Sequence, residues 1–236
     1  MNHALIVLIF SIMLIHSEIA IGTPIINGDF SDSEDLAGFT ATGSKIWEPT
    51  GDFAQLETDV DLARSLEQTF IIPSILTQFS FDFAFSTTGT LTTEDETFPD
   101  SFASSIIADG YFLDIMVVDI RGVVPDASDG IEDTTGAMPI DVVFNPYVTI
   151  AGFTPLANSI TYSGRISLWL PDDVLGKEAT LYFELFSQDD GLQTIAAVDN
   201  ISATPVPEPG TLMLLATGLV GITGLLLRRN FFGKRK

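Results

Sequence analysis

Four phenylalanines at every second position constrain the fold of this chain more than any other feature. Phe79, Phe81, Phe83 and Phe85 alternate with small or polar residues in the run FSFDFAFS. Successive side chains of an extended strand point to opposite faces, so the four rings share one face, whereas a helix would scatter them around its circumference. The run therefore predicts a β-strand over residues 79–86 with one fully apolar face.

Shorter alternating runs recur along residues 23–204. Clusters of Gly, Pro, Asp, Asn and Thr separate them, and this region shows no sustained helical period or internal repeat. With eight or more strands, it is expected to form an all-β domain, an antiparallel β-sandwich of the jelly-roll type. The further strands are expected at residues 24–26, 54–57, 64–71, 111–120, 142–150, 165–170, 181–186 and 194–201.

The first 22 residues have the pattern of a secretory signal peptide. Residues 4–15 (ALIVLIFSIMLI) are almost entirely apolar, and the run is too short to span a membrane comfortably. Small residues follow at Ala20 and Gly22, the spacing that signal peptidase recognises. We expect signal peptidase to remove residues 1–22, although no Lys or Arg precedes the apolar run. The alternative is an uncleaved N-terminal anchor or a buried helix.

Residues 205–236 combine a proline-rich motif, an apolar stretch and a basic end. Residues 211–227 (TLMLLATGLVGITGLLL) are uncharged and lie at the lower length limit for a transmembrane helix. Five of the ten Lys and Arg residues lie in the last nine positions. Because positive flanks of membrane helices stay in the cytoplasm, we expect the tail inside and the preceding chain outside.

The sequence before the apolar stretch reads VPEPGT, and its two prolines keep the backbone extended. This motif, the apolar helix and the following arginine pair together resemble the PEP-CTERM sorting signal. The resemblance implies recognition by an exosortase, a membrane transpeptidase of exopolysaccharide-producing Gram-negative bacteria. The alternative is a plain single-span tail with a proline linker. The residues that form the resemblance are Val206, Pro207, Glu208, Pro209, Arg228 and Arg229.

If the resemblance holds, the protein is exported and is anchored in the membrane through its C-terminal helix, with the tail cytoplasmic, before processing. It then reaches the cell envelope or the extracellular matrix. The resemblance leaves open whether the helix is cleaved off or retained.

Both ends of the expected β domain resemble jelly-roll carbohydrate-binding modules. The opening residues 26–30 (INGDF) and the closing residues 197–201 (AVDNI) are similar to the first and last strands of such modules. Phe39 departs from the family pattern, which often has Trp there. The resemblance implies that the two strands meet and share a structural calcium, with Asp29 and Asp199 as candidate ligands. It also makes polysaccharide a candidate partner.

The composition of the exported region excludes several classes of site. Residues 24–204 contain 30 acidic and 5 basic residues, the chain has no Cys, and both His lie in the first sixteen positions. Disulfides, thiol or histidine catalysis and His/Cys metal sites are thereby excluded from the exported region. The negative charge also disfavours nucleic acid as a partner. Acidic loops suit calcium, or serve only solubility and protection of strand edges.

The function expected from the sequence is that of a non-catalytic envelope or matrix protein. One alternative is a carbohydrate-binding module for exopolysaccharide, and another is a glycan hydrolase that uses paired carboxylates. The aromatic residues that could stack on sugar rings, or could equally pack in the core, are Trp47, Tyr111, Tyr147, Tyr162 and Trp169.

Overall fold

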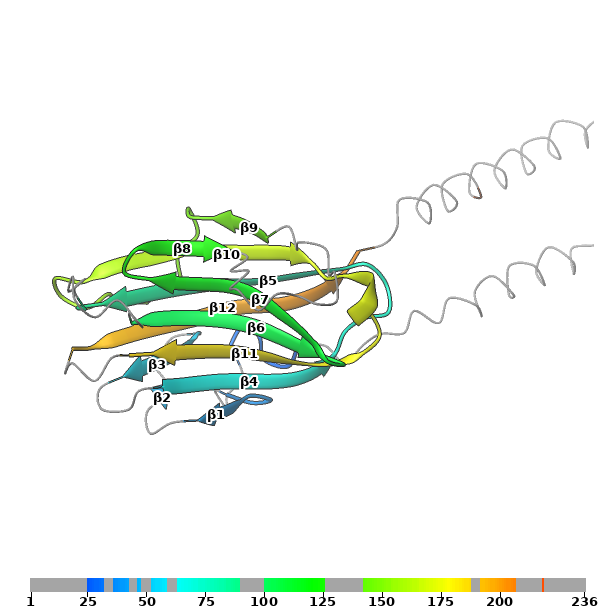
Figure 1. Ribbon diagram of the computed structural model, residues 1–236, viewed down its shortest axis with the longest axis horizontal. Helices are drawn as coiled ribbons and strands as arrows, with labels where there is room; N and C mark the ends of the chain where they lie inside the picture. The colour runs from blue at the N-terminus through cyan, green and yellow to red at the C-terminus, as the bar shows by residue number, and fades with distance from the viewer. Residues whose placement is uncertain are drawn as a thin grey trace, which may run out of the picture.

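The protein is a sandwich of two antiparallel β-sheets in the computed structural model (Figure 1). Sheet A has the strand order β1-β4-β11-β6-β7-β8, and sheet B has the order β2-β3-β12-β5-β10-β9. The expected all-β antiparallel sandwich is therefore confirmed. The structure describes residues 25–31, 36–42, 46–47, 52–58, 63–89, 100–125, 142–187, 192–206 and 218.

Each sheet has six strands in the described parts of the chain. Sheet A consists of β1 (Thr40–Thr42), β4 (Ala63–Ile71), β6 (Ser101–Ala108), β7 (Tyr111–Asp119), β8 (Gly122–Pro125) and β11 (Glu178–Phe186). Sheet B consists of β2 (Ile46–Trp47), β3 (Ala54–Thr58), β5 (Thr77–Thr87), β9 (Val142–Asn145), β10 (Ile160–Trp169) and β12 (Thr194–Pro205). A 3₁₀ turn, η1 (Asp172–Val174), lies between β10 and β11.

Most of the expected strands are present with small shifts at their ends, and β3, β4, β5, β7, β10, β11 and β12 all coincide with predicted runs. The strand expected over 142–150 is shorter than predicted, because the chain turns after Asn145. The strand expected at 24–26 is wrong: Ile26 begins a turn that continues through residue 29, and Asn27 has a left-handed φ of 52°. Strands β1, β2, β6 and β8 were not predicted.

The core lies between the sheets and is centred on the phenylalanine run of β5. All four predicted rings are fully buried, as the alternation required. The ring of Phe81 meets that of Phe183 edge-on at 5.0 Å between centroids, and Phe183 stacks on Phe102 of sheet A at 6.1 Å. Aromatic contacts between β5, β11 and β6 thus join the two sheets.

A second, smaller apolar cluster covers part of the outer face of sheet B. Ala84 of β5 and Ala197 of β12 point outward there, and Phe53, Ile150 and Phe153 pack over them. The loop that follows β9 supplies two of these covering residues, so only the remainder of this outer face is open.

Candidate functional site

A row of polar side chains crosses four strands on the outer face of sheet B, beside the small apolar cluster. Asp199 of β12 is paired in register with Asp82 of β5, which is paired with Arg165 of β10. Arg165 is in turn paired with Asn145 of β9. The strand neighbours of Asp82 and Arg165, among them Phe83 and Ile166, are buried in the core, and so the strand period places this row on the outer face.

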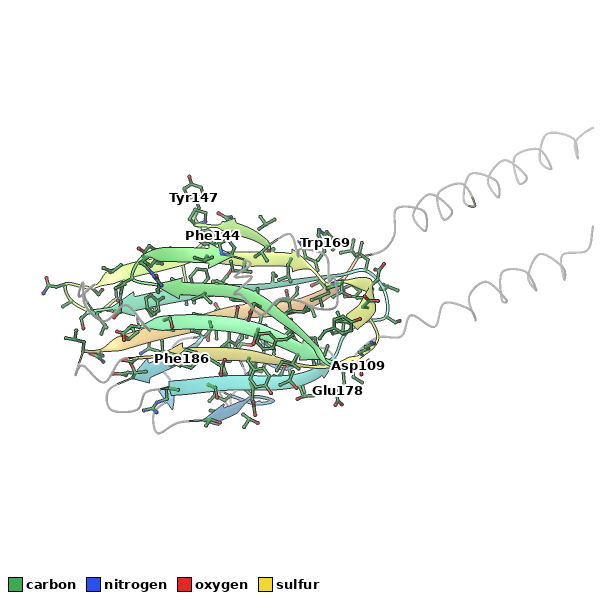
Figure 2. The ribbon with its side chains drawn as sticks, viewed as in Figure 1. Asp109, Phe144, Tyr147, Trp169, Glu178 and Phe186 are labelled. Carbon is green, nitrogen blue, oxygen red and sulfur yellow. The ribbon has the colours of Figure 1, made fainter. Side chains whose placement is uncertain are left out.

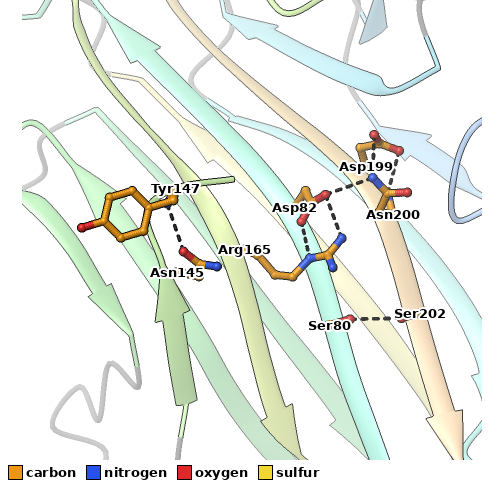
Figure 3. Close-up of polar contacts among 8 residues, drawn as sticks. All are labelled: Ser80, Asp82, Asn145, Tyr147, Arg165, Asp199, Asn200 and Ser202. Atoms are coloured by element: carbon orange, nitrogen blue, oxygen red, sulfur yellow. Dashed lines mark hydrogen bonds and ion pairs between the residues drawn. The ribbon is translucent and has the colours of Figure 1, made fainter. Parts of the chain in front are cut away.

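The centre of this charged row is an ion pair whose acid is buried. Arg165 Nε donates to Asp82 Oδ1 at 2.6 Å, and its Nη2 donates to Oδ2 at 3.0 Å (Figure 3). Asp82 is only 3% exposed. The paired carboxylate raises the pKa of the Arg165 guanidinium above its ordinary value, chiefly through the hydrogen bond. Two parallel hydrogen bonds fix the guanidinium as a flat polar surface on the sheet.

A β-bulge in β12 adds an amide to the row. Asp199 pairs with Asp82 but Ser202 pairs with Ser80, so Asn200 and Ile201 together face one residue of β5. Asn200 has a left-handed φ of 51°. Its Nδ2 donates to Asp82 Oδ2 at 2.9 Å and to Asp199 Oδ2 at 3.0 Å (Figure 3). The bulged residue therefore bridges two carboxylates of neighbouring strands.

Asp199 is the titratable group of this row with the largest change. Its pKa is raised to about 6, chiefly by burial and in addition by the negative charges of Asp82, Asp29 and Asp52, against a hydrogen bond from the Asn200 backbone N–H that lowers it. The guanidinium of Arg165, the basic residue of this row, is already bonded to Asp82. Asp199 can therefore exchange a proton close to neutral pH.

The N-terminal segment meets the bulge, as the resemblance to carbohydrate-binding modules implied, although it does so as a turn. Ile201 N donates to Gly28 O at 2.8 Å. From sheet A, the amide of Gln68 exchanges two hydrogen bonds with the backbone of Ile26, at 3.0 and 2.9 Å. A side chain at Gly28 would collide with Ile201 O, so glycine is required at this contact. Residues 26–28 thus fix one side of the sandwich between the two sheets.

The two predicted calcium ligands come into one region without forming a recognisable ion site. Asp29 accepts hydrogen bonds from Ser31 and is exposed, while Asp199 accepts from Asn200. Within the described ranges, no group of three or more Asp, Glu, His or Cys residues is arranged to hold a metal. Calcium binding by Asp29 and Asp199 stays a prediction from the sequence.

Below the charged row, the open part of sheet B presents hydroxyl and amide groups. Ser80 and Ser202 face each other at 3.1 Å between their Oγ atoms (Figure 3). The next row holds Thr204, Gln78 and Trp169 in register.

The candidate aromatic residues divide into exposed and packed groups. Tyr147 is 92% exposed, and its backbone N donates to the Asn145 side chain; Trp169 is 44% exposed (Figure 2). In contrast, Tyr111 and Tyr162 pack against the core, and Lys177 Nζ lies 5.5 Å from the ring centre of Tyr111. The side chain of Trp47 lies outside the described residues.

The predicted sorting residues fall at the boundary of what the structure describes. Val206 is half-buried, and its N–H donates to Leu76 O at 2.8 Å. Pro207, Glu208, Pro209, Arg228 and Arg229 lie outside the described residues. No helix within the described residues is long and apolar enough to cross a membrane. The expected signal peptide over 1–22 and almost all of the expected helix over 211–227 lie outside them too.

Sequence reasoning named Asp199 but missed Asp82, Arg165 and Asn200. One signal could have found Asp82, since it is the sole charge on the polar face of the phenylalanine run. Arg165 is one of five basic residues among residues 24–204 and alternates with apolar residues in its strand. A buried acid and a scarce base on two predicted strands are candidates for pairing.

Comparison of the sequence with known protein families identifies residues 205–230 as a PEP-CTERM protein-sorting motif. The match confirms the resemblance noted in the VPEPGT segment and indicates an exported protein that is sorted through its C-terminal segment. No sequence among curated proteins matches the chain significantly.

Comparison with solved structures finds similarity mainly to carbohydrate-binding modules. A module specific for non-crystalline cellulose, CBM28, aligns at 13% identity and a TM-score of 0.39, covering 76% of this chain and 93% of the module. The N-terminal cellulose-binding domain of Cellulomonas fimi β-1,4-glucanase C aligns at 11% identity and a TM-score of 0.39, covering 79% of this chain and 99% of that domain. A cyclase from Fischerella sp. TAU aligns at 11% identity and a TM-score of 0.37, covering 79% of this chain and 98% of the cyclase. Similarity at this level carries no information about a ligand.

Proposed function

We propose that the protein is an exported, non-catalytic component of the cell envelope or extracellular matrix, sorted by an exosortase through residues 205–230. The match of these residues to the PEP-CTERM sorting motif is the observation that supports this proposal. The all-β sandwich and the lack of His and Cys in residues 23–204 agree with a structural or binding role.

The sorting step is tested by changing the motif in the producing cells. Pro207→Ala together with Glu208→Ala should block maturation, because recognition is proposed to depend on these side chains. Intact mass and cell fractionation measure the outcome. A matched double variant away from the motif, Pro155→Ala in the loop after β9 with Glu67→Ala on the outer face of β4, should mature normally. Unchanged mass and location of the motif variant would refute the sorting function.

Binding of exopolysaccharide is a second candidate function, favoured by the composition of the outer face of sheet B. Tyr147 and Trp169 expose aromatic surface on or beside this face, and the planar groups of Arg165 and Asn200 lie among its strands (Figure 3). Aromatic rings with nearby fixed polar groups are suited to sugar rings, which have apolar faces and hydroxyl edges.

Affinity electrophoresis in gels containing exopolysaccharide from the producing cells tests this second candidate. Tyr147→Ala should abolish retardation, whereas Phe112→Ala, which removes a ring that is 55% exposed on sheet A, should not. Equal behaviour of the two variants would contradict a sugar site on sheet B. Release of reducing sugar during the assay would instead indicate a hydrolase.

A further inference from the structure

The sorting motif begins where the last strand of the sandwich ends, with no residue between them. β12 pairs with β5 as far as Pro205, opposite Thr77, and the next residue, Val206, is hydrogen-bonded to Leu76 O at 2.8 Å. Both Pro205 and Val206 also belong to the matched motif, residues 205–230. Pro207 therefore follows, directly in the sequence, the last residue that the ladder holds.

Two connected loops form the surface around this point. The loop after β4 is joined to the loop before β11 by hydrogen bonds from Ile72 N to Lys177 O at 2.9 Å and from Gly176 N to Ile72 O at 3.1 Å. Leu170 N also donates to Thr77 O at 3.0 Å, and Val174 of η1 is fully buried beneath the surface. These bonds make the end of the sandwich a fixed platform at the exit of β12.

Two large apolar side chains are exposed on this platform. Leu76, whose carbonyl holds Val206, is 37% exposed, and Trp169 is 44% exposed. Trp169 is in register with Thr204 across one intervening strand, so it lies about 10 Å from β12. Exposed apolar side chains on a fixed surface mark interaction sites when they cluster. Asp172 and Asp173 add negative charge to the same end.

The short distance to the motif identifies the partner. Each extended residue adds at most about 3.3–3.6 Å, so the two residues after Val206 can reach no more than about 7 Å from it. An enzyme that takes Pro207, Glu208 and Pro209 into its active site must therefore press its own surface against the platform. We propose that the end of the sandwich around Leu76 and Trp169 is the docking surface for the exported face of the processing enzyme. This inference rests on the proposed sorting function.

The platform adds binding energy that the motif alone does not supply. Its apolar side chains would meet an apolar patch of the enzyme, and Asp172 and Asp173 would face basic groups. Folding of the domain and processing are then coupled, because the platform exists only when β5, β10 and β12 are assembled.

The experiment follows processing of full-length protein in the producing cells by pulse-chase and intact mass. Trp169→Ser and, separately, Leu76→Ser should slow processing about fivefold or more, the usual loss on truncating a central interface side chain. The matched controls are Phe186→Ser and Ile160→Ser, which remove apolar side chains that are each 40% exposed. Phe186 lies at the end of β11 away from Trp169 (Figure 2), and Ile160 begins β10, the strand that Trp169 ends. Melting curves of the purified variants confirm that each is folded.

A flexible insertion supplies a second, independent measurement. Ten Gly/Ser residues between Val206 and Pro207 separate the motif from the platform. Processing should fall to the rate of Trp169→Ser, and adding Trp169→Ser should slow it no further. Wild-type rates in both platform variants, or faster processing with the insertion, would overturn the docking proposal. Normal processing of the Pro207/Glu208 variant would instead refute the sorting function itself, so the two failures are distinguishable.

Discussion

Two ion pairs of the molecule, one on the outer face of sheet B and one between loops beside sheet A, hold their acids differently. On sheet B, Asp82 is 3% exposed and is bonded twice to Arg165, which lies beside the carboxylate of Asp199. On sheet A, the ion pair of Lys177 and Asp109 lies at exposed loops, with side chains 36% and 66% exposed. A buried acid needs its partner to remain in the fold, whereas an exposed acid can exchange its partner for water.

The largest expected effect comes from breaking the two ion pairs in parallel. Arg165→Met leaves the buried carboxylate of Asp82 unpaired and should lower the free energy of unfolding by about 3 kcal/mol. Lys177→Met should leave the denaturation midpoint unchanged, because Asp109 is solvated. Urea denaturation at pH 7 measures both. Asp82→Asn added to Arg165→Met should recover part of the loss. Equal midpoints for Arg165→Met and Lys177→Met would remove the distinction between the two ion pairs.

A smaller change in stability is expected from neutralising the carboxylates with raised pKa values, Asp199 on sheet B and Glu184 on sheet A. The folded pKa of Asp199, about 6, lies above its unfolded value of about 3.9. Its charge therefore opposes folding above pH 6, and this penalty vanishes as the pH falls towards 4. Asp199→Asn should stabilise the protein by about 1 kcal/mol at pH 7.5, after allowance for its half-exposed position, and by nothing near pH 4.

The salt dependence of stability distinguishes the causes of the two pKa shifts, those of Asp199 and Glu184. Burial alone raises the pKa of Glu184, whereas neighbouring carboxylates add to the shift of Asp199. Added salt should therefore shrink the gain from Asp199→Asn but leave any gain from Glu184→Gln unchanged. Melting temperatures across pH and salt measure this, and the opposite salt response would contradict it.

Millimolar calcium in the same assay should stabilise the wild type, but not Asp199→Asn, if Asp29 and Asp199 bind the ion.

The smallest effect is expected away from the charged row, where the two faces should behave alike. Ser80 and Ser202 form a cross-strand hydroxyl pair at 3.1 Å on sheet B, and Thr69 and Thr180 form one at 3.0 Å on sheet A. Ser80→Ala and Thr69→Val should each change stability by about 0.5 kcal/mol or less. Thermal melts give the comparison. A clearly larger loss of stability for Ser80→Ala than for Thr69→Val would show that the polar contacts of sheet B outside its charged row also contribute strongly to stability.

Local pattern was sufficient to predict most of the fold. β11 alternates strictly in burial because one face is buried and the other is not. β5 alternates in residue type, although its outer face is also buried from Asp82 on. In both strands the two-residue period is visible in the sequence. β6 reads SFASSIIA, in which Ser104 is buried and Ile107 is exposed, so apolar and polar residues do not alternate and no period could identify the strand. Residues 24–26 are apolar, but the turn that begins at Ile26 is held by Gln68, which is distant in sequence.

The candidate site was less predictable because register creates it. Asp199 was recognisable from the AVDNI segment, but its position beside Asp82 depends on the pairing of β12 with β5. Arg165 meets Asp82 through pairing on the other side of the same strand. Strand order is set by the whole fold, so no local pattern contains it. The motif at 205–230, in contrast, is contiguous and could be read directly.

Because of the bulge in β12, the charged row can change during evolution while the core stays the same. Removing Asn200 would leave Asp199 outward, Ile201 inward and Ser202 outward, which is the alternation of an ordinary strand. The bridging amide could therefore be gained or lost through one inserted or deleted codon, without moving any core residue to the wrong face. A lineage could change the chemistry of this surface by such a step and keep the sandwich that presents it.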